Sequence, residues 1–224
     1  IIDPVDDVRV SNPATNPELL DKLAAQLTAY RYDFKKLVRD ICTSRTYQLS
    51  AVPNATNAGD EANFAKAGVR RIRAEVLLDA VNDASGGSDT FAGMPPGSRA
   101  VQAWSYKIES QFMDAFSRPD PSMDPPCERD AHLSVVQSLH LMNSKGLQGK
   151  LSAAGGRARK LSDGTRSPSE IVTELYLATL SRPPLPAELA VATSAFVSPG
   201  ATRVHATEDV LWALLNSAEF VFNH

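Results

Sequence analysis

The sequence has little of what most metal-binding and catalytic motifs are built from. Its 224 residues include two cysteines and four histidines, too few for a dense disulfide framework. No apolar run approaches the roughly 20 residues that a membrane-spanning helix needs. The formal net charge of −3 argues against a broad nucleic-acid-binding surface. Phosphate-binding glycine loops and the Gly-x-Ser-x-Gly and His-Glu-x-x-His motifs are missing too. These absences exclude the commonest signatures of nucleotide enzymes, serine hydrolases and zinc proteases.

What is present is the composition of a globular protein. Hydrophobic residues make up 43% and charged residues 22%, both ordinary values. The length allows a sizeable core. Because the chain starts Ile-Ile-Asp-Pro without a methionine, we interpret it as an excised fragment of a larger protein. We expect residues 1–224 to form a single, mainly helical domain.

Helical periodicity dominates the N-terminal part. Asn16 and Pro17 predict the start of a helix that runs to about residue 30. Asp33 predicts the N-cap of a second helix over residues 34–42, which should pair with the first as a hairpin. Its apolar side chains recur at i, i+3, i+4, i+7 and i+8: Phe34, Leu37, Val38, Ile41 and Cys42. We therefore expect Cys42 to face a core.

Further amphipathic helices are predicted on both sides of a long irregular region. One carries an apolar stripe of Val69, Ile72, Val76, Leu77 and Ala80. Ser167, Pro168 and Glu170 form a predicted capping box before a helix over residues 168–180. A last helix should turn inward Val210, Leu211, Leu214, Leu215 and Ala218.

Residues 85–130 have the length of loops that wrap a surface or carry function, and wrapping is our interpretation. We expect an exposed basic loop over residues 145–160, and at most a short extended piece at 99–104. The predicted fold class is all-α: an irregular multi-helix bundle with long wrapping loops and little or no β-structure.

Residues 124–144 place Cys127, His132 and His140 close together in the sequence. Covalent haem attachment needs two cysteines followed closely by histidine, as Cys-x-x-Cys-His, and this stretch has one cysteine with four residues between it and the next histidine. On a helix, His132 and His140 would lie about 12 Å apart along the axis and roughly 80° apart around it. They cannot share one metal ion, so we expect no metal site, with Cys127 as the weak candidate that is left.

The same helix predicts a partly polar interior face. Val135, Val136, Leu139 and Met142 form its apolar arc, and His132 and Asn143 fall inside that arc with His140 at its edge. Buried polar groups are usually hydrogen-bonded within the protein, so we expect these side chains to hold loops in place. The alternative is a catalytic site built from His132, His140, Asn143 and either Arg70 or Arg71. A nucleophilic pair of Cys127 with His132 or His140 is a further alternative that the sequence leaves open.

Aromatic residues in the irregular region are candidates for binding. Trp104 and Tyr106 lie between predicted elements, and exposed aromatic anchors mark binding sites. With two cysteines in the chain, the sequence leaves open whether Cys42 and Cys127 are reduced or oxidised.

Taken together, several segments resemble a known family along essentially the whole chain. They include NPELLD, SRTYQLS, PPGSRAVQ, CER, LHLMN and ELYLATLSRPP. The sequence is similar to Domain of Unknown Function family 1553, which is abundant in planctomycetes. The resemblance implies the C-terminal part of a secreted or cell-envelope protein, often with a cytochrome c domain and in a polysaccharide-processing context. It supplies no catalytic residues.

These observations lead to two functional hypotheses. The first is a non-catalytic interaction or docking module of an envelope-exported, cytochrome-associated multidomain protein. Its partners would be other domains of the parent, such as a cytochrome c domain, or a glycan, with no nucleic acid and no membrane span in this fragment. The second is a hydrolase or redox component acting on polysaccharide. We expect no cofactor in this fragment, with haem only in a neighbouring domain, and the residues leave open whether the chain is an enzyme.

Overall fold

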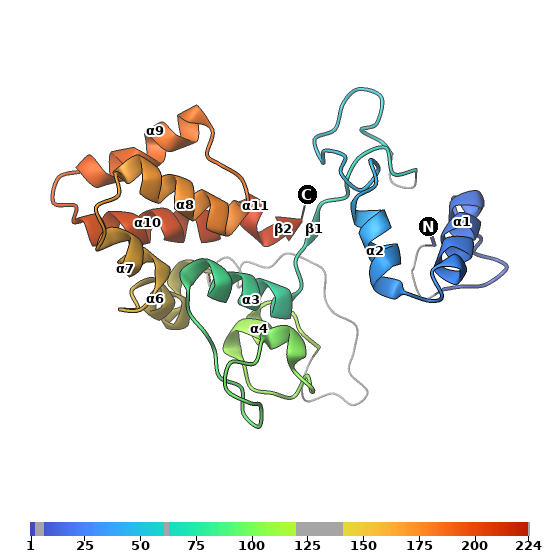
Figure 1. Cartoon of the computed structure of the whole chain (residues 1–224), viewed down its shortest axis with the longest axis horizontal. Coiled ribbons are helices and arrows are strands. Elements are labelled where there is room, and N and C mark those ends of the chain that lie inside the picture. Colours follow the sequence, from blue (N-terminus) through green and yellow to red (C-terminus); the bar gives the residue numbers. More distant parts are fainter. Residues whose placement is uncertain (3–6, 61–62, 120–140, 224) are drawn as a thin grey trace. The chain divides into compact units, whose positions relative to one another are not determined.

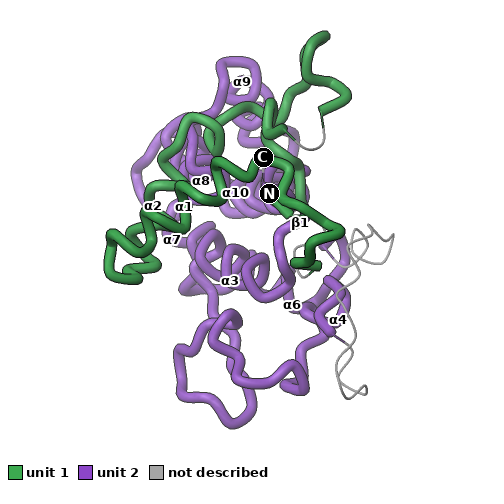
Figure 2. The backbone as a smooth tube through the Cα atoms, turned by 90° about the vertical axis from the view of Figure 1, so that its right-hand side faces the viewer, with its two compact units in different colours: residues 1–70, 224 green, residues 71–223 purple. Residues whose placement is uncertain are grey.

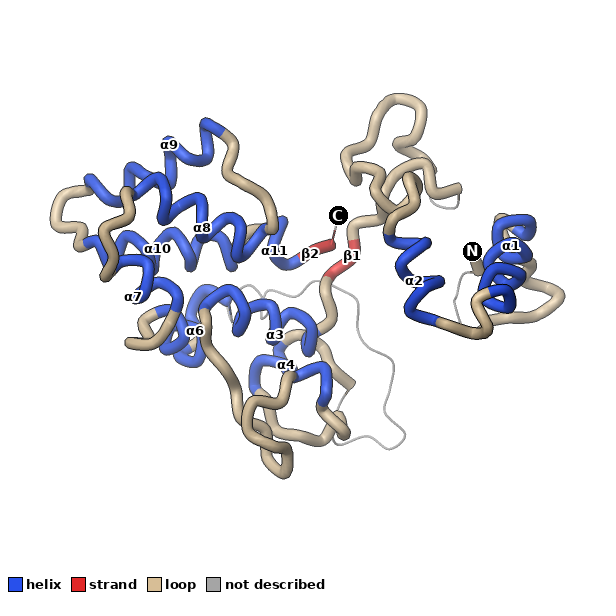
Figure 3. The backbone as a smooth tube through the Cα atoms, in the orientation of Figure 1, coloured by secondary structure: helices blue, strands red, loops and turns tan. Residues whose placement is uncertain are grey.

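The computed structural model describes residues 1–2, 7–60, 63–119 and 141–223. Helices account for most of its regular structure (Figure 3), with one sheet of two very short strands. The prediction of a mainly α-helical fold is confirmed. The chain divides into two compact units, residues 1–70 (unit 1) and residues 71–223 (unit 2), coloured separately in Figure 2. Whether residues 1–224 fold as one domain stays a prediction.

Unit 1 contains a helical hairpin, α1 (Pro17–Ala29) and α2 (Phe34–Cys42). The predicted Asp33 N-cap is confirmed, because its carboxylate accepts a hydrogen bond from the Lys36 N–H. Asn16 precedes α1 as expected but makes no side-chain capping bond. Tyr30 links the two helices: its hydroxyl donates to Asp40, and its ring lies 4.1 Å from the Lys36 ammonium. The hairpin is therefore held largely by exposed polar contacts.

The loop after α2 is ordered by local hydrogen bonds. The Asn54 side chain accepts from the Thr56 and Asn57 N–H groups, in the manner of an Asx turn. The Asp60 carboxylate accepts from the Asn63 and Ala65 N–H groups. This span is thus held by hydrogen bonds among its own groups, and none of its described residues, 54–60 and 63–66, is buried.

Unit 2 contains the remaining elements. They are β1 (Arg70–Arg71, whose first residue belongs to unit 1), α3 (Ala74–Ser85), η1 (Ala100–Gln102), α4 (Gln111–Ala115), α6 (Lys145–Leu151), α7 (Arg157–Ser162), α8 (Pro168–Leu180), α9 (Pro186–Ser194), η2 (Ala195–Val197), α10 (Arg203–Leu215), α11 (Ala218–Val221) and β2 (Phe222–Asn223). In Figure 1, α8 and α10 run side by side, and α7, η2 and α11 also pack on α10. The backbone N–H of Ile72 bonds to the Val221 carbonyl beside the β1–β2 pair.

The hydrophobic core of unit 2 is built from the inner faces of α3, α8 and α10. Fully buried members include Leu77, Ile171, Leu175, Leu211 and Leu215. Each large side chain buried this way contributes about 1.5–3 kcal/mol relative to exposure. The predicted inward face of α10 is confirmed for its four Val and Leu residues, although Ala218 is exposed and begins α11. The Ser167–Glu170 capping box is also confirmed.

The long loop after α3 is fastened by a buried carboxylate. Asp79 on α3 accepts hydrogen bonds from the N–H groups of Ala100 (2.7 Å) and Val101 (3.1 Å) at the start of η1. The neighbouring Arg99 forms an ion pair with Asp83. The segment PPGSRAVQ is therefore tied to α3, in accord with our interpretation that the loop wraps the bundle.

The C-terminus of α3 is covered by the start of α7. Arg157 donates from Nε to the Ala84 carbonyl and from Nη2 to the Asp83 carbonyl. These carbonyls lie in the last turn of the helix, where a cation is favourable. A Cβ atom on Gly156 would lie 3.0 Å from the Ala153 carbonyl oxygen and 3.3 Å from the Ser85 carbonyl oxygen at the end of α3, so this close approach favours glycine.

Several expectations are wrong in detail. Residues 145–160, expected as a loop, contain α6 and most of α7, because Leu147, Leu151 and Ala158 are buried in the core. The segment at 99–104 forms the 3₁₀-helix η1 in place of an extended piece. The apolar stripe of α3 is rotated: Val76 is exposed, whereas Leu78 and Val81 are buried.

Candidate functional site

Most of the sequence-predicted catalytic cluster lies outside the described residues. Cys127, His132 and His140 fall within 120–140, so their proposed roles stay predictions. Across the part of the chain that the structure describes, no group of three or more His, Cys, Asp or Glu side chains is placed to hold a metal ion. The same part contains no helix both long and apolar enough to cross a membrane.

Asn143 does not face the interior. Residues 141–143 are helical, but Asn143 is exposed and Met142 is 46% exposed. The expectation that both lie on the buried face is wrong, because Leu141 is the residue of this turn that enters the core. Asn143 is therefore open to solvent and holds no loop from within.

Arg70 and Arg71 occupy β1. Successive side chains on a strand point to opposite faces, and here Arg70 is exposed whereas Arg71 is half-buried. The catalytic alternative needs one of the two beside His132 and His140, which lie outside the described residues, so that role stays a prediction.

The two candidate aromatic residues differ in environment. Trp104 is 73% exposed, and its ring edge lies near Gly93. Tyr106 is half-buried and lines a cavity of about 290 Å³. Of the pair, Tyr106 belongs to a concave site and Trp104 to an open surface.

An apolar surface lies on α2. We define the α2 face by Phe34, Leu37, Val38 and Ile41. Only Leu37 is buried, at 8% exposure, whereas Phe34 is 68% exposed. Cys42 continues this face one turn beyond Val38 and is a free, exposed thiol, so the expectation that it is buried in a core is wrong. The helical spacing was predicted correctly, but among the described residues of unit 1 Leu37 is the one member of this face that is buried.

Two of the cavities lined by described residues of unit 2 contain ionisable side chains. The first, of about 260 Å³, is lined by Lys150, Asp89 and Glu109 among others. Its lysine is already engaged, because Nζ lies 2.8 Å from Asp89 and 2.6 Å from the Asn82 amide oxygen. The second, which we call the Arg118 cavity, is walled by the start of α3, by residues 100–106 and by residues 113–118.

The turn that ends α4 places Arg118 in the wall of this cavity. The helix closes with a Schellman motif, in which Ser117 N–H bonds to the Asp114 carbonyl and Arg118 N–H to the Met113 carbonyl. Ser117 takes the left-handed conformation, with φ +61°. The Arg118 side chain is 2% exposed, and its guanidinium donates from Nε to the Asp114 carboxylate and from Nη1 to the Ile108 carbonyl.

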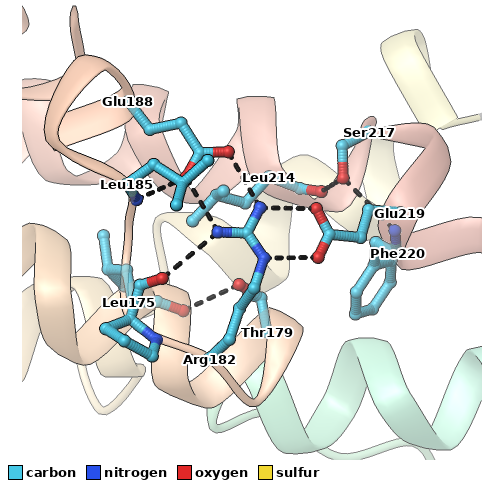
Figure 4. A network of polar contacts seen from close by, with 10 residues as sticks. Leu175, Thr179, Arg182, Leu185, Glu188, Leu214, Ser217, Glu219 and Phe220 are labelled. Atoms are coloured by element: carbon cyan, nitrogen blue, oxygen red, sulfur yellow. Dashed lines mark hydrogen bonds and ion pairs between the residues drawn. The ribbon is translucent and has the colours of Figure 1, made fainter. Parts of the chain in front are cut away.

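A second arginine ends α8 in a related way (Figure 4). Ser181 also has a positive φ, +56°, and Arg182 follows it. The Arg182 guanidinium lies between two carboxylates: it donates to Glu188 at 2.8 Å from both Nη atoms, and to Glu219 at 2.6 Å from Nε. This network connects α8, α9 and α11 around a single cation.

The contacts in this network shift the pKa values of Glu188 and Arg182. The hydrogen bonds from Arg182, and then from the Leu185 N–H, lower the pKa of Glu188 to about 2. The two carboxylates raise the pKa of Arg182 further above its already high value. One cation between two anions leaves a net negative charge, so the network favours structure over anion binding.

Sequence reasoning missed both arginines. The available signal was the triplet Ser-Arg-Pro, which occurs at 117–119 and again at 181–183. Proline cannot continue a helix, and a polar residue before it can take the left-handed turn. The triplet therefore indicates a helix end that turns an arginine back onto the helix.

Comparisons with known proteins identify the family. A family model described as PSD1, protein of unknown function (DUF1553), matches residues 1–196. Comparison with curated proteins and with solved structures finds no match. Because the matched region covers well over half of the chain, the protein belongs to the PSD1 family of unknown function (DUF1553).

Proposed function

We propose that the chain is a non-catalytic interaction module that docks onto an apolar protein surface through the α2 face. The single observation that carries this proposal is the exposure of Phe34, Val38 and Ile41 on one side of a regular helix. Scattered exposed apolar residues are normal, but contiguous ones mark interaction sites. Covering the three side chains stabilises a complex by roughly 25 cal/mol for each Å² of apolar surface removed from water.

The surroundings of the α2 face suit a protein partner. Lys35, Arg39 and Asp40 lie on the remaining surface of the same helix, which gives an apolar centre with a charged rim. An amphipathic helix placed in an apolar groove is a common mode of recognition. The occupant we propose is another domain of the same parent protein, since the resemblance implies a multidomain parent.

The cellular setting is part of the same proposal. An envelope-exported, cytochrome-associated parent in a polysaccharide context rests on the family resemblance. The catalytic alternative rests on His132 and His140, which lie outside the described residues, and it stays a prediction.

The exposed thiol of Cys42, which borders the α2 face, provides the test. In a Cys127→Ser background, Cys42 is the remaining cysteine of the two in the chain, so its alkylation rate reports access to α2. We expect the rate to fall about tenfold or more in the intact parent relative to residues 1–224 alone. The introduced substitution Phe34→Ser should restore fast alkylation in the parent.

A second thiol supplies the control. Thr165 is exposed in a turn of unit 2, so a cysteine introduced by Thr165→Cys should react at one rate in both forms. Equal reactivity of Cys42 in the isolated chain and in the parent would reject docking through α2.

A further inference from the structure

The first of the two cavities in unit 2, which we call the Glu109 cavity, is formed by elements that share one core. Its walls come from α3, from the loop after α3, from the start of α4 and from α6. Both α4 and α6 pack on α3 (Figure 1). The volume of about 260 Å³ lies near the lower end of small-molecule sites, about 300–1,000 Å³. The cavity therefore has room for one small ring.

A partly buried polar network holds three of these walls together. The Lys150 ammonium on α6 lies 2.8 Å from the Asp89 carboxylate in the loop and donates to the Asn82 amide oxygen on α3 at 2.6 Å. The Asn82 amide nitrogen donates in turn to Asp89 at 2.9 Å. This triangle ties α3, the loop and α6 to one another. The cavity is therefore preorganised, which reduces the ordering cost of binding.

The opening of the cavity carries polar side chains that are not engaged. Within the described part of the chain, Thr90, Glu109 and Gln111 make no side-chain hydrogen bond or ion pair. All three are exposed, so water satisfies them until a ligand enters. Together they offer a hydroxyl, a carboxylate and an amide to a polar ligand.

Two serines add donors of fixed position. Ser110 and Ser144 are the N-caps of α4 and α6, where their Oγ atoms accept from the Met113 and Leu147 N–H groups. Both serines line the cavity and are half-buried. A serine hydroxyl has one hydrogen to donate and two lone pairs to accept with. Capping uses one lone pair of each serine, so each retains its hydrogen for a ligand.

The deep part of the cavity is apolar. Leu78, Val81, Phe91 and Leu147 line it, and each is at most 8% exposed. These side chains offer a C–H surface with no hydrogen-bonding atoms of its own. A ligand that fits must therefore combine an apolar face with a polar edge.

The charges of the lining favour a neutral ligand. Asp89 and Lys150 neutralise each other, which leaves Glu109 as the uncompensated charge among the described lining residues. An anion would be repelled by Glu109, and a cation would meet the Lys150 ammonium beside Asp89. A neutral ring with several hydroxyl groups matches both the charges and the mixture of donors and acceptors.

We propose that the Glu109 cavity binds one neutral sugar ring. Glu109 accepts from the ring hydroxyls, the hydroxyls of Ser110 and Ser144 donate to them, and Thr90 bonds the ring at the opening. Val81 and its apolar neighbours cover the C–H face of the ring. The site lies in unit 2 and is independent of docking through α2.

The test uses leucine and valine methyl groups as reporters. Val81 and Leu147 line the cavity, whereas the buried Leu211 does not. The chain 1–224, with ¹³C-labelled Leu and Val methyl groups, is titrated in NMR experiments with the methyl glycosides of D-glucose, D-galactose and D-mannose. We expect at least one of them to shift the Val81 and Leu147 methyl signals saturably, with the Leu211 methyl signals unchanged.

Two further probes separate sugar recognition from other binding. The methyl glycoside of D-glucuronate should bind about tenfold more weakly than the best neutral glycoside, because its carboxylate is repelled by Glu109. Cyclohexanol, a ring with a single hydroxyl, should also bind about tenfold more weakly, because it leaves most of the polar edge without a partner.

Three variants probe the wall. Thr90→Val removes one hydroxyl at nearly constant volume and should weaken binding of the neutral glycoside about fivefold. Thr165→Val, at an exposed threonine outside the cavity, is the matched control and should leave the affinity unchanged. Glu109→Gln should remove the discrimination against the glucuronate glycoside. Gly146→Phe should fill the cavity and abolish the ligand-dependent shifts, since a Cβ at Gly146 meets only Ser144 Oγ, at 3.5 Å.

Three results would overturn the proposal. They are the absence of a saturable shift at Val81 and Leu147 with every neutral glycoside, equal affinity of the native chain for cyclohexanol or the glucuronate glycoside, and binding that survives Gly146→Phe. Since Cys42 alkylation is measured separately, failure here leaves the docking proposal standing, and the reverse also holds.

Discussion

Units 1 and 2 use similar amphipathic helices to different ends. In unit 2 the apolar faces of α3, α8 and α10 meet, so Leu77, Leu175 and Leu211 are fully buried. In unit 1 the equally periodic α2 buries Leu37 and leaves Phe34 exposed. An apolar stripe therefore predicts a helix and the face of it that is apolar, but it does not predict whether another part of the protein covers that face.

Polar contacts show the same contrast. In unit 1, Asn54, Asp60 and Lys66 bond to groups a few residues away along the chain. In unit 2, Asp79, Arg157 and Arg203 bond to groups separated by 21 to 73 residues. Long-range contacts make a unit unfold cooperatively, whereas local ones open piece by piece. We therefore expect the two units to differ in both stability and cooperativity.

The largest expected effect compares one buried apolar residue of unit 2 with one exposed apolar residue of unit 1. Leu211→Ala should lower the free energy of unfolding of unit 2 by about 2–5 kcal/mol, because the side chain is fully buried. Phe34→Ala should change it by less than about 0.5 kcal/mol. Both tryptophans, Trp104 and Trp212, lie in unit 2, so urea unfolding followed by their fluorescence measures this unit. Equal destabilisation by the two substitutions would remove the distinction.

The next effect concerns the fastening of the long loop. Asp79→Ala leaves two N–H donors at the start of η1 without their carboxylate and should cost about 1.5–3 kcal/mol. Limited proteolysis should then cut within residues 86–106 faster than in the native chain. Asp79→Asn retains one acceptor oxygen and should fall between the two. Unchanged cleavage in Asp79→Ala would contradict a fastening role.

A smaller effect is the pH dependence of unit 2. The pKa of Glu188 is lowered in the folded chain to about 2, against about 4.3 when unfolded. A lowered pKa means stability that is present above pH 4.3 and lost as the pH falls towards 2. The fluorescence midpoint in urea should drop across this window. Glu188→Gln should flatten the drop, and an unaltered profile in that variant would assign it to other carboxylates.

The smallest effect lies in unit 1. Tyr30→Phe removes the hydrogen bond to Asp40 that joins the two helices of the hairpin. Because this contact is exposed, we expect faster amide hydrogen exchange in α2 and no change in the tryptophan-monitored unfolding of unit 2. A shift in that unfolding would mean that unit 2 depends on the hairpin.

Local signals predicted much of this fold. Asp33, Ser167 and Glu170 marked helix starts correctly, because capping is a contact between near neighbours in the chain. The inward face of α10 was also predicted, since Val210 and Leu214 lie on one side of any regular helix. The errors arose where neighbours were remote. The buried face of α3 differs from the predicted one because η1 and α8 pack on the helix. Residues 145–151 form α6 because Leu147 and Leu151 are buried in the core.

The candidate sites were less accessible from the sequence. Tyr106 was selected as an aromatic residue, but its role in a cavity wall depends on Arg73 and Arg118, which lie 33 and 12 residues away along the chain. The Arg182 network similarly joins Glu188 with Glu219. Such sites depend on loop closure and packing, which residue spacing does not encode directly.

By itself the sequence determined the helical character of this protein, several of its caps and its membership of the PSD1 family. Tertiary structure decided which apolar faces are covered, where the long loop is tied, and which remote carboxylates pair with an arginine. The physical reason is range: capping and periodicity act over a few residues, whereas burial and charge pairing depend on whatever chain segments folding brings together. That is why Leu211 and Phe34, alike in pattern, end in opposite environments.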